Sequence, residues 1–62
     1  MTYEEAFDYI RSLSSLREGA IKEVLDERMK EKGEFELSDE DSGAAFVIRY
    51  DDSNGFTIDA VF

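Results

Sequence analysis

Apolar residues near the start of the chain recur at helical spacing. Thr2 followed by Glu5 has the spacing of a capping box, in which each side chain accepts a hydrogen bond from the other residue's backbone N–H. The pattern therefore predicts a helix that begins at Tyr3 and buries one narrow stripe. The residues of that stripe are Tyr3, Ala6, Phe7, Ile10 and Leu13.

A second helical pattern follows the interruption SLSS. Ser15 and Glu18 repeat the capping-box spacing, and Gly33 is suited to end the helix as its C′ residue. A wider apolar face lies between them, which predicts a second helix that reaches as far as Gly33. The residues of this face are Leu16, Ala20, Ile21, Val24, Leu25 and Met29. The expected i,i+4 pairs are Glu18–Lys22 and Asp26–Lys30.

After Gly33 the pattern changes to alternation, which is typical of strands. A short strand would have Phe35 and Leu37 on one side, opposite Glu34 and Glu36. A second strand is predicted from about Ala44 to Asp51. The third is predicted from Phe56 to Phe62, with one face formed by Phe56, Ile58, Ala60 and Phe62.

The spacing of the last hairpin predicts its register. A three-residue loop of Ser53, Asn54 and Gly55, with glycine in the left-handed conformation, places Asp52 opposite Phe56. The resulting inner pairs are Tyr50–Ile58, Ile48–Ala60 and Phe46–Phe62, and the outer pairs are Arg49–Asp59 and Val47–Val61. A two-residue Asn54–Gly55 loop would instead set Ile48 beside Val61 and Tyr50 beside Asp59. We prefer the three-residue loop because it keeps polar and apolar positions on separate faces.

Together these patterns predict a single α+β domain over residues 1–62. Two helices would pack on one face of a three-stranded antiparallel β-meander, in the order ααβββ. A chain of 62 residues buries only about 60% of the surface that its unfolded form exposes, so we expect marginal stability and no large enclosed active site.

Composition restricts the chemistry that this domain can perform. The chain has no Cys and no His, which excludes disulfides, thiol redox chemistry and the usual general base near neutral pH. The N-terminal sequence MTYEEAF has neither a basic start nor a hydrophobic segment. We therefore expect no signal peptide, no transmembrane helix and a cytoplasmic location.

Known catalytic and metal-binding motifs do not fit the acidic segments. With Gly43 at position 6 of an EF-hand loop, Ser38 would occupy position 1 and Arg49 position 12; with Gly55 at position 6, the loop would begin at Tyr50 and the chain would end too soon. No nucleophile elbow, Walker A or dinucleotide fingerprint occurs. We expect no metal, no cofactor and no catalytic residue, although weak divalent-cation binding by clustered carboxylates stays open.

The negative charge is concentrated in the second half of the chain. Residues 1–32 have a net charge of −2 and residues 33–62 a net charge of −7, with Arg49 as the one basic residue of that half. This balance argues against direct binding to nucleic acid or anionic membranes and favours a basic partner. We expect the partner to bind the carboxylates of the uncovered sheet face and its loops, around the apolar residues Ala45, Val47 and Val61. These carboxylates belong to Glu34, Glu36, Asp39, Glu40, Asp41, Asp51, Asp52 and Asp59.

With the acidic stretches EFELSDEDSG and RYDDSNG on a small sheet, the chain resembles the DNA mimics and anti-CRISPR proteins that phages use against host nucleic-acid machinery. The resemblance implies a non-enzymatic inhibitor that occupies a DNA- or RNA-binding surface, with carboxylates in place of phosphates. Immunity proteins and antitoxins that block basic toxins are similar by the same criterion. Two other interpretations stay open: a small interaction module or homodimer that uses the sheet face or edge, and acidic turns that only keep the protein soluble.

Overall fold

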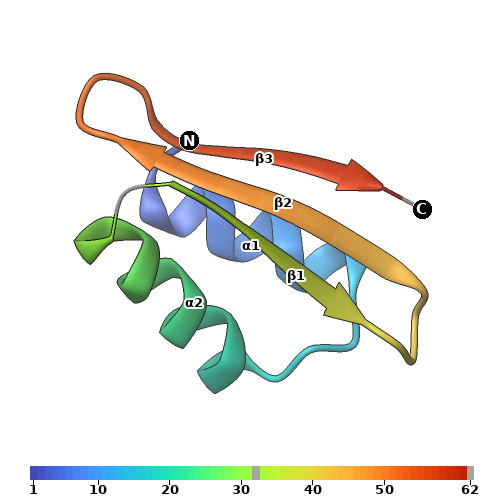
Figure 1. Ribbon diagram of the computed structural model, residues 1–62. Helices are drawn as coiled ribbons and strands as arrows, with labels where there is room; N and C mark the ends of the chain where they lie inside the picture. The colour runs from blue at the N-terminus through green and yellow to red at the C-terminus, as the bar shows by residue number, and fades with distance from the viewer. Residues whose placement is uncertain (32, 62) are drawn as a thin grey trace.

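The computed structural model describes residues 1–31 and 33–61. Two helices lie on one face of a three-stranded antiparallel sheet whose strand order is β1-β2-β3 (Figure 1). The predicted α+β fold with the order ααβββ is therefore confirmed. The elements are α1 (Tyr3–Leu13), α2 (Glu18–Lys30), β1 (Glu34–Asp39), β2 (Ala44–Asp51) and β3 (Gly55–Val61).

The hydrophobic core lies between the helices and the sheet face that they cover. Phe46 and Ile48 on the central strand have no exposed surface, because they lie on the sheet face that the helices cover. Burial of a side chain of this size contributes about 1.5–3 kcal/mol. The buried apolar residues are Ala6, Ile10, Ile21, Leu25, Ala44, Phe46, Ile48, Phe56 and Ile58.

Helix α1 begins at the predicted capping box. The Thr2 hydroxyl accepts the Glu5 N–H at 3.2 Å, and the Glu5 carboxylate accepts the Thr2 N–H at 2.9 Å. These hydrogen bonds hold the pKa of Glu5 below its ordinary value, and the Thr2 backbone N–H makes the larger contribution.

One turn further on, the Tyr9 ring of α1 contacts Phe46 edge to face, with 6.3 Å between ring centroids. The cap thus fixes where the helix begins, and the aromatic contact fixes how it sits on the sheet.

Both predicted ends of α2 are wrong. The N-cap residue is Arg17, which makes no side-chain cap, and the Ser15 backbone N–H donates to the Asp39 carboxylate instead. At the other end the helix stops at Lys30, followed by an extended C-cap residue. Gly33 therefore does not occupy the C′ position. Its φ of +124° also lies far from the left-handed helical conformation that a C′ glycine adopts.

The buried face of α2 is rotated from the predicted one. Ala20 is exposed and the Met29 side chain is 49% exposed, whereas Arg28 is 7% exposed. Arg28 lies three residues after Leu25 and so falls on the same stripe. Its apolar stem covers the core edge while its guanidinium lies 5.2 Å from the centre of the Phe35 ring.

The ion pairs of the helices also differ from those predicted. Within residues 1–31 and 33–61, neither Glu18–Lys22 nor Asp26–Lys30 forms a salt bridge. The pairs that involve helical arginines are Arg11–Glu18 at 3.1 Å and Arg28–Glu31 at 3.4 Å.

The β2–β3 register is shifted by two residues from the predicted one. Asp51 pairs with Gly55 and Tyr50 with Phe56, so neither the three-residue nor the two-residue loop that we considered is correct. The loop closes on the Asp51 carboxylate, which accepts the N–H groups of Ser53 at 2.9 Å and Asn54 at 2.7 Å. A strand repeats its faces every two residues, so a shift of two leaves the described side chains of β2 and β3 on their predicted faces.

Individual cross-strand pairs change with this shift. Arg49 lies opposite Thr57 rather than Asp59, and Phe46 lies opposite Ala60. Phe62, which was expected to pair with Phe46, lies outside the described residues.

Met1 pairs with the start of β3 at its open edge. The Met1 carbonyl accepts the Phe56 N–H at 2.8 Å, and the terminal ammonium donates to the Phe56 carbonyl at 2.7 Å. The neighbouring Gly55 has a φ of +73°, and a Cβ placed there would overlap the Met1 carbonyl oxygen. Glycine is therefore required at this position by both its backbone conformation and the close approach of Met1.

We expect Gly55→Ala to lower the free energy of unfolding more than Gly43→Ala does. Gly43 has a similar φ of +76° but open space around it. Its replacement should therefore cost only the free energy of holding alanine in the left-handed conformation, about 1–2 kcal/mol. At Gly55 the overlap with Met1 should add about 1 kcal/mol or more. Urea denaturation of both variants, with Met1 verified by mass spectrometry, measures the difference. Equal losses would contradict the Met1 contact.

Candidate binding surface

The face of the sheet opposite the helices is covered by no described element (Figure 1). We call it the outer sheet face, and strand pairing arranges its residues in three rows that run from β1 through β2 to β3. The rows are Glu34–Arg49–Thr57, Glu36–Val47–Asp59 and Ser38–Ala45–Val61.

The middle row combines two carboxylates with an apolar residue. Glu36 and Asp59 are exposed on the two edge strands and lie on either side of Val47, about 10 Å apart if measured as two strand spacings. Among the described residues neither carboxylate has an ion-pair or hydrogen-bond partner. In the next row Val61 is 57% exposed, which extends the apolar strip. The face can thus bind cations at its edges and apolar groups between them.

The first row contains an internal ion pair. The Arg49 guanidinium donates to the Glu34 carboxylate across β1 and β2, and both side chains are about half exposed. The predicted Arg49–Asp59 pair is wrong because the register places Thr57 at that position. Glu34 therefore lies on the predicted surface with its charge balanced, so a partner cation would have to compete with Arg49 for it.

Asp39 is buried, and the prediction that it belongs to the exposed surface is wrong. It is 6% exposed, and like Phe35 and Leu37 it lies on the face of β1 that is turned toward the helices. Its carboxylate accepts the Ser15 N–H at 2.6 Å, the Ser42 hydroxyl at 2.7 Å and the Asp41 N–H at 3.1 Å. Asp39 thereby fastens the α1–α2 linker to the β1–β2 turn.

These hydrogen bonds hold the pKa of Asp39 below its ordinary value. The Ser42 hydroxyl has the largest effect, the Ser15 N–H the next, and burial of the carboxylate opposes both. The negative charge is thus stabilised by donors of the same chain. Asp39 is a structural residue that is not available to a partner.

The other predicted carboxylates lie in the two turns, at opposite ends of β2. Glu40 and Asp41 are exposed in the β1–β2 turn, and Asp52 is exposed in the β2–β3 loop. Asp51 closes that loop, and the Asn54 N–H is the main cause that lowers its pKa. Because the eight residues of β2 span about 25 Å, the two turns cannot converge on one point.

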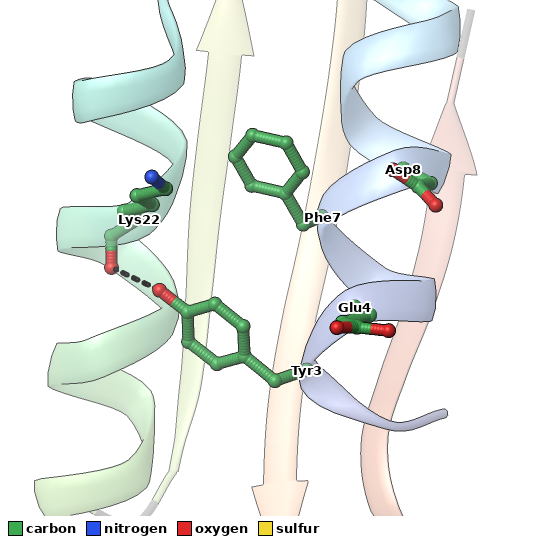
Figure 2. A pocket seen from close by; sticks show the side chains of 5 residues that line it. All are labelled: Tyr3, Glu4, Phe7, Asp8 and Lys22. Atoms are coloured by element: carbon green, nitrogen blue, oxygen red, sulfur yellow. Dashed lines mark hydrogen bonds between the residues drawn. The ribbon is translucent and has the colours of Figure 1, made fainter.

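Sequence reasoning did not identify a groove between the two helices. It has a volume of about 380 Å³ and is lined by Tyr3, Glu4, Phe7, Asp8 and Lys22. Figure 2 shows Tyr3 and Phe7 pointing from α1 toward α2, with the Tyr3 hydroxyl donating to the Lys22 carbonyl at 3.5 Å. The Lys22 ammonium lies 5.7 Å from the centre of the Phe7 ring. Burial raises the pKa of Tyr3, and the nearby Asp26 carboxylate acts in the same direction.

Two further features of the described residues bear on chemistry. No group of three or more Asp or Glu side chains is placed to hold a metal ion within residues 1–31 and 33–61. Neither α1 nor α2 is long and apolar enough to cross a membrane.

We expect Asp39→Asn to destabilise the protein at neutral pH more than Asp41→Asn, which removes the same charge from an exposed position. Because the pKa of Asp39 is lowered by folding, its contribution is complete above the unfolded value of about 3.9 and is lost as the pH falls toward the folded value. The difference between wild type and Asp39→Asn should therefore shrink at about pH 3. Urea denaturation at both pH values tests this, and a constant difference would contradict it.

Sequence and structure comparisons provide no relative from which a role for this surface could be transferred. Comparison with protein-family models, with curated proteins and with solved structures found no match. The assignment of function therefore rests on the surface itself.

Proposed function

We propose that this protein is a non-enzymatic inhibitor that binds a basic, nucleic-acid-handling protein through the outer sheet face and the β1–β2 turn. The observation that supports this proposal is the outer sheet face itself, which no described helix covers. On it Glu36 and Asp59 lie beside an apolar strip and have no partner among the described residues. The net charge of −7 over residues 33–62 adds a long-range attraction to basic surfaces.

In this proposal the carboxylates take the place of phosphates. Arginine binds both groups with the same planar fork of N–H donors, so a site built for a nucleic-acid backbone can also bind Glu36 and Asp59. The negative field of the sheet half steers the two proteins together, while contact with Val47 and Val61 slows dissociation. Binding would then block the nucleic-acid site without any chemical reaction.

A second candidate is an interaction module that associates with itself through the sheet. The exposure of Val61 on the outer sheet face favours it. The two candidates differ in their response to salt. Binding through carboxylates weakens steeply as ionic strength rises, whereas apolar self-association changes little.

Affinity capture from the source cells with matched charge variants tests the proposal. The sheet variant combines Glu36→Lys, Glu40→Lys and Asp41→Lys, all at exposed positions that leave Asp39 intact. The helix variant combines Asp8→Lys, Glu23→Lys and Glu27→Lys, which are exposed and change the net charge by the same amount. We expect the helix variant to retain the partner and the sheet variant to lose it, with a loss of about 2 kcal/mol or more in direct binding.

A second measurement asks what the captured partner does. We expect the wild-type protein to displace DNA or RNA from that partner in a competition assay. Equal losses in the two variants would show that overall charge alone matters. A partner that neither binds nucleic acid nor distinguishes the variants would contradict the proposal.

A further inference from the structure

Among the described residues, the edge of β3 is hydrogen-bonded only at its start. The N–H and C=O groups of Phe56 point away from β2, since both bind Met1. Backbone groups two residues apart along a strand point to the same side, and β3 pairs with β2 without a bulge from Gly55 to Val61. Ile58 and Ala60 therefore present their N–H and C=O groups at the open edge. No segment within residues 1–31 and 33–61 pairs with them.

Met1 shows that this edge accepts an extended residue. Its carbonyl and its ammonium bind the N–H and the C=O of Phe56 reciprocally, as two residues do in a strand pair. The pairing stops there because the chain enters α1 at Tyr3. Beyond Phe56 the same row of donors and acceptors continues past Ile58 to Ala60.

The side chains along this edge favour a basic segment. Asp59 is exposed on the outer sheet face and has no ion pair among the described residues, and β3 contains neither Lys nor Arg. A Lys or Arg opposite Asp59 would form a favourable cross-strand pair. On the other face Ile58 is 8% exposed and Ala60 is half-buried, so an added residue facing the helices would be apolar. The edge thus fits an extended segment in which basic and apolar residues alternate.

A second copy of the chain fits the same edge poorly. Within the described residues, the antiparallel register that engages Ile58 and Ala60 of both copies pairs each with the other, and it sets the two Asp59 side chains directly opposite one another. Like charges in that position are destabilising. A register centred on Ile58 would instead require the edge groups of Phe56, which Met1 occupies.

We propose that the basic partner adds an extended segment to the edge of β3 as a fourth strand, with a Lys or Arg facing Asp59. This inference rests on the proposed function for the charge of the partner, and it adds the mode of binding. Backbone hydrogen bonds to Ile58 and Ala60 supply affinity, and the alternating side chains supply specificity.

A synthetic peptide of alternating Lys and Val, acetylated and amidated at its ends, serves as the probe. NMR hydrogen exchange at low ionic strength should show that the peptide slows exchange of the Ile58 and Ala60 amides about tenfold or more, because these become hydrogen-bonded. The amides of Thr57 and Asp59 already face β2 and should change little. The same peptide with N-methyl groups on alternating residues keeps its charge but loses its donors along one edge. It should bind about tenfold more weakly, as expected for two lost hydrogen bonds.

A variant of the protein tests the same hydrogen bonds by removing a donor from β3. Ala60→Pro removes an N–H that faces away from β2, so it costs no hydrogen bond of the sheet and is of the kind that edge strands tolerate. It should reduce peptide binding about threefold, as expected for one lost hydrogen bond, while the circular dichroism spectrum is unchanged. The N-methylated peptide keeps the inference testable should this variant not fold.

The outcomes separate this inference from the proposed function. Peptide-induced shifts at Glu36 and Val47 without slower exchange at Ile58 and Ala60 would overturn strand addition and leave binding to the outer sheet face. Absence of peptide binding would overturn the inference, while the capture experiment would still decide the function. Slower exchange at higher protein concentration without peptide would identify a second copy as the occupant and overturn the basic segment.

Discussion

The two helices cover only one face of the sheet, and this determines which strand residues are buried and which are exposed. The outer strands of a three-stranded sheet lie about 10 Å apart, and two helices packed 8–10 Å apart roughly match that width. The described residues contain no third helix, so no described element covers the other face. On β2 this separates Phe46 and Ile48, which have no exposed surface, from Val47 and Arg49 on the opposite side. Of the acids in the second half of the chain, Glu34, Glu36 and Asp59 lie on this uncovered face.

Periodicity was sufficient to predict the five elements and the faces of β2 and β3, because burial of one strand face dictates the alternation residue by residue, but it did not predict the ends or the buried face of α2. It was not sufficient for the β2–β3 loop, whose closure depends on hydrogen bonds that a pattern does not contain. The Asp51 carboxylate holds the N–H groups of Ser53 and Asn54, and Met1 binds Phe56 from 55 residues away. The error of two residues left the core intact, since a strand repeats its faces every two residues.

The placement of residues on the outer sheet face was predicted correctly where charge and parity agree. Glu36, Val47, Asp59 and Val61 lie on the outer sheet face, as their alternation indicates. At Asp39 the two signals conflict. The alternation along β1 places its side chain on the face toward the helices, whereas an ionised carboxylate is more stable in water. Parity prevails because three donors surround the carboxylate, and the shortest of these bonds comes from Ser15, in a segment that the sequence does not place beside β1. A buried acid of this kind can be identified only when the packing of the helices is known.

The carboxylates of this protein therefore divide into two groups by what already binds them. Glu5, Asp39 and Asp51 accept backbone hydrogen bonds from their own chain, and in each case these bonds lower the pKa. Glu36 and Asp59 have no such partners among the described residues, so binding a cation at either one breaks no internal hydrogen bond. A carboxylate that must first release its own donors binds a partner less favourably, because those donors are then left unsatisfied. Under the proposed function, the absence of internal donors, rather than the net charge of −9, therefore distinguishes the acids that are free to take the place of phosphates.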